Sequence, residues 1–140
     1  MGGTFDHFHE GHELLIRTAL SVSNSIVIGL TTSNLLKNKK FASKLEDYKT
    51  RKKNIEKFVN SFTDLKRVKI VELNDPYGPP INEPNYDGIV VSQETYQNAL
   101  KINEIRENKG FKSMIIIVIP ILKDKNDLKI SSTSIRERLI

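Results

Sequence analysis

The stretch Gly3-Thr4-Phe5-Asp6-His7-Phe8-His9-Glu10-Gly11-His12 stands near the start of the chain and leads directly into an amphipathic segment over residues 11–23. Three apolar residues of that segment recur on one helical face, namely Leu15, Ala19 and Val22. A helix beginning at Gly11 turns its free main-chain N–H groups and the positive end of its dipole toward the preceding residues. His9 and His12 add imidazole donors at the same place. The stretch therefore predicts a phosphate-binding turn at the start of a helix.

Short apolar segments and amphipathic segments alternate along the rest of the chain. We expect strands at residues 25–30, 68–73, 88–92 and 114–119, the last fully buried, and helices at 48–62, 93–108 and 131–139. This alternation predicts one α/β domain over residues 1–140, with a Rossmann-like, doubly wound parallel sheet of about five strands and helices on both faces. Such sheets bind ligands beyond the carboxyl ends of their strands. The segments at that edge are residues 2–12, 31–40, 74–85, 92–95 and 120–133.

The composition narrows the class of protein. The 140 residues include no cysteine, which excludes disulfides, thiolate metal sites and cysteine nucleophiles. A formal net charge of +5 favours anionic partners such as nucleotides or nucleic acid, without choosing between them. No apolar run reaches the length of a membrane span, and the N-terminus has no apolar signal core. We therefore expect a cytoplasmic protein without a membrane partner.

A metal site is the main alternative for the first stretch, because His7, His9 and His12 all fall within six positions. Zinc requires further nitrogen or sulfur ligands, and the chain has no other histidine and no cysteine. The residues therefore predict no protein-bound metal.

A second run of polar residues stands near the other end of the chain, Ile130-Ser131-Ser132-Thr133-Ser134-Ile135-Arg136. Hydroxyls and main-chain N–H groups at a helix start can cradle phosphate oxygens, and an arginine one turn later can bind them with its forked guanidinium. The alternative is an ordinary hydroxyl N-cap followed by a solvated arginine.

The two runs together resemble the GTFD…HxGH and ISSTxIR motifs of the nucleotidyltransferase superfamily related to class I aminoacyl-tRNA synthetases. Three further stretches, Gly78-Pro79, Val90-Val91-Ser92-Gln93-Glu94-Thr95 and Ile102-Asn103 with Arg106 and Gly110, are similar to the archaeal and eukaryotic form of phosphopantetheine adenylyltransferase. This second resemblance covers nearly the whole chain and implies the nucleotidyltransferase fold.

The resemblance implies transfer of an adenylyl group from ATP to 4′-phosphopantetheine, with Mg²⁺ bound mainly through ATP. It implies His12, Lys37 and Arg136 as catalytic residues, and Thr4 and Lys37 as residues that bind the acceptor. The nucleotide-binding residues that it implies are Gly3, Thr4, Phe5, His9, Gly11, His12, Ser92, Glu94, Arg106, Ser131, Ser132, Thr133 and Arg136. For several of these residues the alternative is a role unrelated to binding or catalysis: a solvated basic loop for Lys37, a helix cap for Ser92 and a surface position for Arg106.

Other functions share parts of these motifs. Nicotinamide mononucleotide adenylyltransferases have a similar second motif but usually open with a GRFQP-like turn, and cytidylyltransferases and archaeal FAD synthetases usually close with an RTxGIS-type segment that this chain lacks. A non-catalytic nucleotide- or RNA-binding module would suit the positive charge. The chain has no tryptophan for base stacking, so nucleic acid is an unlikely partner. The oligomeric state stays open between a monomer and a homo-oligomer.

One feature departs from the family's pattern. In this fold a buried apolar strand is expected before Gly3, and only Met1 and Gly2 precede it here. Without that strand its neighbours would keep unpaired edges. We therefore expect that a form extended at the N-terminus would be more stable and more active.

Overall fold

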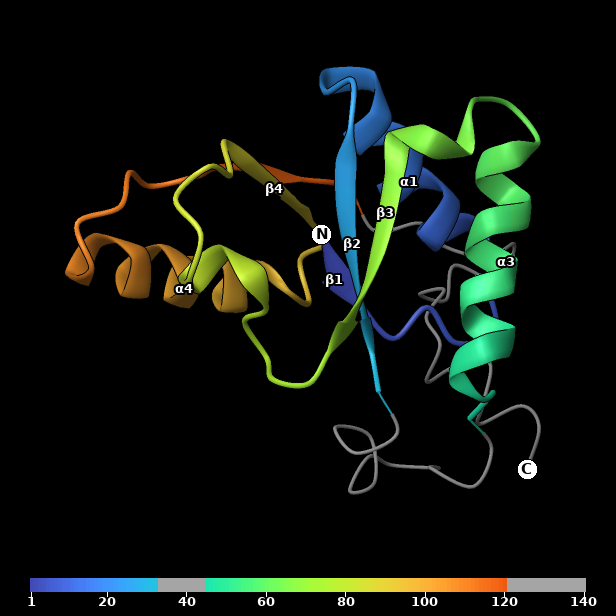
Figure 1. The fold of residues 1–140 in the computed structure, drawn as a ribbon, viewed down its shortest axis with the longest axis horizontal. Coiled ribbons are helices and arrows are strands. Elements are labelled where there is room, and N and C mark those ends of the chain that lie inside the picture. Colours follow the sequence, from blue (N-terminus) through green and yellow to red (C-terminus); the bar gives the residue numbers. More distant parts are fainter. Residues whose placement is uncertain (33–44, 121–140) are drawn as a thin grey trace.

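The computed structural model describes residues 1–32 and 45–120. In this part the strands are β1 (Gly2–Gly3), β2 (Ile26–Thr31), β3 (Val68–Leu73), β4 (Gly88–Val91) and β5 (Ile115–Val118). The helices are α1 (Glu10–Val22), α3 (Tyr48–Asn60) and α4 (Tyr96–Asn108), with short 3-10 turns at Leu65–Arg67 and Pro79–Ile81 (Figure 1). The alternation predicted over the described residues is confirmed. The lysine loop around Lys37 and the predicted helix at 131–139 lie outside them.

Neighbouring strands pair in parallel and form two separate hydrogen-bonded sheets. One has the order β1-β2-β3 and the other consists of β4 and β5. The predicted Rossmann-like α/β fold with parallel strands and flanking helices is confirmed. Its strands are not joined into one sheet in the described chain, because β1 has two residues and pairs only with Gly29 and Leu30 of β2. Among the described residues β4 pairs on one edge alone, with β5.

Helices cover both faces of the β4–β5 sheet, as a doubly wound fold requires. Alternate residues of β4 point in opposite directions: Ile89 and Val91 pack with Ala99 of α4, whereas Val90 packs with Ala19 of α1. The largest core cluster joins α1, β2 and α3 on one face of the other sheet, and its buried members are Phe5, Ile16, Leu20, Ile28, Leu30, Ile55 and Val59. Helix α1 therefore contacts both sheets.

Two local predictions need correction. The last strand was expected to be fully buried, but Ile115 is 70% and Val118 is 42% exposed. β5 pairs only with β4 within the described chain, so its outward side chains meet solvent. The helix expected from residue 93 begins at Tyr96, because Ser92 to Thr95 form a turn in which the Ser92 N–H donates to Thr95 Oγ1 at 3.1 Å.

Candidate active site

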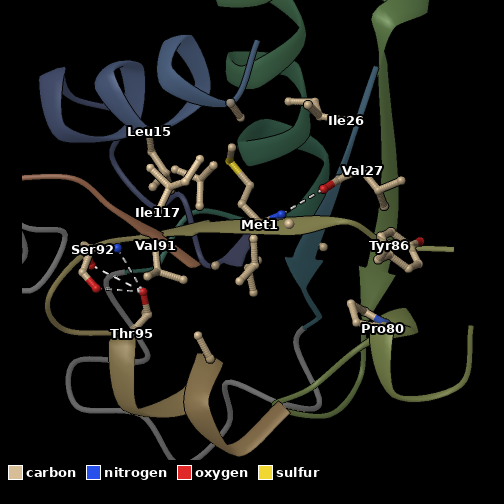
Figure 2. Close-up of a pocket in the computed structure, with 18 of the residues that line it drawn as sticks. Met1, Leu15, Ile26, Val27, Pro80, Tyr86, Val91, Ser92, Thr95 and Ile117 are labelled. Carbon is tan, nitrogen blue, oxygen red and sulfur yellow. Dashed lines mark hydrogen bonds between the residues drawn. The ribbon is translucent and has the colours of Figure 1, made fainter. Parts of the chain in front are cut away.

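A cavity of about 1170 Å³ is lined by residues of both sheets and by the loops at their carboxyl ends. Met1 lies in this cavity, with Leu15, Val91 and Ile117 around it (Figure 2). Its main-chain nitrogen donates a hydrogen bond to the Val27 carbonyl at 3.1 Å. Eight of the sequence-predicted site residues line the cavity, and so does Thr95: the eight are Gly3, Thr4, Phe5, His9, Gly11, His12, Ser92 and Glu94. Thr95 belongs to the predicted turn after β4. The fold thus brings the first stretch and that turn to one cavity.

Two histidines cap the start of α1. His9 is the N-cap residue, and its Nδ1 accepts a hydrogen bond from the Gly11 nitrogen at 3.1 Å. His12 Nδ1 accepts in return from the His9 main-chain nitrogen at 3.2 Å. This is the reciprocal geometry of a capping box, built here from imidazoles in place of a hydroxyl and a carboxylate. The sequence predicts the helix start, but its spacing alone does not reveal that the histidines form the cap.

These hydrogen bonds determine the state of both imidazoles. A ring nitrogen that accepts carries no proton, so each neutral ring holds its proton on Nε2. Burial lowers the pKa of His9 to about 4. Burial and the neighbouring His9 lower the pKa of His12 to about 3. At neutral pH both side chains are therefore uncharged hydrogen-bond donors.

The Nε2 atom of His9 is a buried donor that a ligand could satisfy. It has no hydrogen-bond partner in the described part of the chain, although buried donors are nearly always paired. It belongs to the N-cap residue of α1, which lines the cavity. A phosphate oxygen at this helix start would accept from this donor and from main-chain N–H groups together.

The turn before α1 has an unusual backbone. Phe5 (φ 51°) and His7 (φ 47°) both adopt the left-handed region, which costs free energy in residues other than glycine. Phe5 is 2% exposed and packs in the main core cluster, with its ring centroid 5.2 Å from that of His12. Core packing of the Phe5 ring therefore offsets the strain of this turn.

Asp6, His7 and Glu46 have potential metal-ligating atoms within 4.8 Å of one another. Their contacts indicate a structural role instead. Asp6 Oδ1 accepts from the Glu46 nitrogen at 2.9 Å, and Glu46 Oε1 accepts from the His7 nitrogen at 2.7 Å. The cluster ties the turn to the segment before α3.

Arg106 does not line the cavity, and its contacts in the described chain indicate a structural role, so its part in nucleotide binding stays a prediction. Its side chain is 0% exposed, and its guanidinium donates to five main-chain carbonyls at 2.7–3.3 Å. The acceptors are Lys112, Pro80, Glu83, Pro84 and Tyr86. Its neighbour Asn103 binds the nitrogen and the oxygen of Met114. Both side chains secure loops around α4.

Ser92 is not the N-cap of α4, contrary to the alternative given for it. Thr95 is the N-cap residue of α4 and makes no capping bond with its side chain. Its hydroxyl accepts from Ser92 at the end of β4, so the two residues form a closed turn beside the cavity. Lys37, Ser131, Ser132, Thr133 and Arg136 lie outside the described residues.

Sequence reasoning missed Arg51. This residue sits in the first turn of α3 and is 1% exposed. In the sequence it stands in a run of lysines on an amphipathic helix, so no local pattern separates it from solvated charges.

Comparison with known proteins agrees with this geometry. The model of the cytidylyltransferase-like family matches residues 1–138. The chain is 43% identical over its whole length to proteins named phosphopantetheine adenylyltransferase from Pyrococcus abyssi and Pyrococcus horikoshii, and covers 88% of each. A similar protein from Methanopyrus kandleri, with the same name, is 39% identical over 97% of the chain.

A solved structure shares the fold. A crystal structure of a protein of unknown function from Archaeoglobus fulgidus superposes with a TM-score of 0.75 at 31% identity, covering 86% of this chain and 95% of that one. No described helix has the length and apolar character needed to cross a membrane. From the match over nearly its full length and from these relatives, the chain belongs to the cytidylyltransferase-like family.

Proposed function

We propose that this chain is an adenylyltransferase that joins ATP and 4′-phosphopantetheine, giving dephospho-coenzyme A and pyrophosphate. Full-length relatives with the name of this activity, at about 40% identity, support the choice of acceptor. The structural observation that carries the proposal is the pair of uncharged histidines at the start of α1, with the buried Nε2 of His9 unpartnered among the described residues.

The reaction requires no protein base. The second pKa of a phosphate monoester is near 6, so the acceptor is mostly a dianion at neutral pH. One of its oxygens attacks the α-phosphorus of ATP, and the bond from that phosphorus to the β-bridging oxygen breaks as pyrophosphate leaves with its electron pair. The protein has to bring two anions into line and stabilise the charge that develops.

The described residues suit these tasks. His12 donates to an α-phosphate oxygen as negative charge builds, and His9 donates to the nucleotide phosphates. Because both are uncharged, they remain donors across the neutral range without an ionisation of their own. Thr4 lines the cavity one residue before the left-handed turn and binds the acceptor phosphate. Ser92 and Glu94 contact the nucleotide from the end of β4.

Lys37, Ser131, Ser132, Thr133 and Arg136 complete the proposed site from the sequence motifs alone. Mg²⁺ binds together with ATP and neutralises part of the phosphate charge. The residues of the histidine turn that line the cavity include no carboxylate, which suits a metal held mainly by phosphate oxygens.

The test is a direct assay. The purified chain is incubated with ATP, Mg²⁺ and 4′-phosphopantetheine, and dephospho-coenzyme A is detected by mass spectrometry alongside coupled release of pyrophosphate. Nicotinamide mononucleotide as acceptor and CTP as donor serve as controls. We expect efficient transfer with the first pair only. Preference for either control substrate, or no product with phosphopantetheine, would overturn the proposal.

A further inference from the structure

A buried arginine outside the cavity joins three segments around the phosphate-binding turn. Arg51 Nη1 donates to the main-chain oxygens of Thr4 at 3.1 Å and Thr31 at 2.8 Å. Its Nε donates to the Glu46 oxygen at 3.0 Å. One guanidinium therefore links the residue after β1, the end of β2 and the segment that leads into α3.

The link closes through Asp6. The Glu46 main chain is held on both sides, since its N–H donates to Asp6 Oδ1 and its carbonyl accepts from Arg51. Asp6 is 0% exposed. Burial lowers the pKa of Arg51, and the neighbouring Asp6 carboxylate opposes this effect by favouring the protonated guanidinium. Removing one member of such a buried set leaves the others without partners, which is costly.

We propose that Arg51 is a positioning residue for the acceptor phosphate and acts through Thr4. The proposal rests on the proposed function, in which Thr4 binds that phosphate. The Thr4 carbonyl begins the peptide that leads into the strained Phe5. A guanidinium bond to this carbonyl sets the orientation of the Thr4 residue relative to the cavity that it lines.

The nucleotide half of the site is secured separately. The start of α1 is held by the reciprocal hydrogen bonds of His9 and His12. The hydrogen bonds of Arg51 in the described chain go instead to Glu46, Thr4 and Thr31. Loss of the Arg51 link should therefore impair use of the acceptor far more than binding of ATP. A purely structural role would weaken both or neither.

The experiment compares Arg51→Lys with Ile55→Ala. Lysine keeps the charge but lacks the planar fork that serves several carbonyls at once. Ile55 lies one helical turn along α3, is 0% exposed and belongs to the main core cluster, so its truncation destabilises the same helix without touching Thr4. Steady-state kinetics are measured well below both melting temperatures, and the ATP dissociation constant is measured by calorimetry without acceptor.

For Arg51→Lys we expect kcat/KM for phosphopantetheine to fall about 100-fold, the usual effect of a small misplacement of a reacting group. The ATP dissociation constant should change less than about threefold, a difference below 1 kcal/mol. Ile55→Ala should lower the melting temperature and retain the kinetics of the unmodified chain. The inference is overturned if Arg51→Lys has the same kinetics as Ile55→Ala. It is also overturned if Arg51→Lys weakens ATP binding by the same factor as it lowers kcat/KM for phosphopantetheine.

If Arg51→Lys does not fold, Asp6→Asn decides the matter. Asparagine keeps an oxygen for the Glu46 N–H but removes the charge beside Arg51. We therefore expect kcat/KM for phosphopantetheine to fall about tenfold, with little change in the ATP dissociation constant. Unchanged kinetics in Asp6→Asn would then overturn the inference. Failure of the unmodified chain to use phosphopantetheine overturns the proposed function as well, whereas an active chain insensitive at Arg51 overturns only the positioning role.

Discussion

His12 Nδ1 accepts a hydrogen bond from the main-chain nitrogen of His9 at 3.2 Å, and the two rings stack with their centroids 3.8 Å apart. The same side chains therefore cap helix α1 with Nδ1 and keep their protons on Nε2. Structural and chemical roles are divided between the two nitrogens of each ring. Substitutions that imitate one nitrogen at a time should separate these roles.

The first prediction uses that division at His12. The Oδ1 atom of asparagine imitates Nδ1 and retains the cap, whereas the Nε2 atom of glutamine imitates the histidine donor. His12→Asn should keep a near-native melting temperature and lose about 100- to 1000-fold in kcat, the usual effect of removing one donor to a developing charge. His12→Gln should retain more activity. Equal kcat values in both variants would contradict the assigned donor.

A second prediction concerns acid stability. The pKa values of His9 and His12 are lowered by burial from 6.5 to about 4 and about 3, so the unfolded chain takes up protons first as the pH falls. The free energy of unfolding should therefore decrease below pH 6.5, by at most about 1.4 kcal/mol per pH unit per histidine, until the folded pKa values are reached. Above pH 6.5 these two groups contribute no pH dependence.

Urea unfolding at several pH values between 7 and 4 measures this effect. The double variant His9→Gln, His12→Gln should have a flatter profile over that interval. An identical slope in both proteins would show that the histidines are not buried in their neutral form.

The third prediction concerns Gly11. A Cβ atom at this position would lie 2.9 Å from His9 Cε1 and 3.1 Å from His9 Nδ1. Gly11→Ala should displace the His9 ring and reduce kcat at least about tenfold, while the gain in helix propensity of about 1 kcal/mol limits the loss of stability. Ser21→Ala, at an exposed position of the same helix, serves as the control. Normal turnover in Gly11→Ala would show that the position of the His9 ring is unimportant.

A fourth prediction separates Arg106 from the nucleotide. Arg106→Met should reduce the free energy of unfolding by roughly 1–3 kcal/mol, because five partly buried main-chain carbonyls lose their donor. Below the melting temperature its ATP affinity should stay within about threefold of normal. Lys109→Met removes an exposed donor to the Ile81 carbonyl of the same loop and should have a small effect. A large loss of ATP affinity in folded Arg106→Met would support a direct role for this residue.

The fifth prediction concerns the missing pairing between β1 and β4, which leaves the two sheets of the described chain separate. Burial lowers the pKa of the Met1 amino group to about 6, and β4 has a free edge among the described residues. An engineered extension of four β-branched apolar residues before Met1 should continue β1 between β2 and β4, and raise the melting temperature by roughly 5 °C or more. Because it would precede Met1, the extension would lie away from Thr4 and the histidines, which follow β1, and should increase the rate by fixing β1. A Gly-Ser extension of equal length is the control, and equal melting temperatures would contradict the idea.

Much of the local structure follows from the sequence. The strands at Ile26–Thr31 and Val68–Leu73 and the helix from Tyr48 have periodic apolar patterns, and the structure has them within two residues of the expected ends. The start of α4 was missed because the Ser92–Thr95 turn uses side-chain bonds that compete with helix formation. The exposure of Ile115 was missed because an apolar run looks the same on a central and on an edge strand.

By itself the sequence determined the order of strands and helices, the family, and the helix start that carries His9 and His12, because these depend on local periodicity and on a contiguous motif. Only the tertiary structure decided which charged residues leave the surface. Arg51 and Arg106 resemble their solvated neighbours in sequence, yet each binds carbonyls of residues distant along the chain. Tertiary packing likewise decided the neutral state of the histidines, because desolvation depends on what the folded chain places around a side chain and not on its neighbours in sequence.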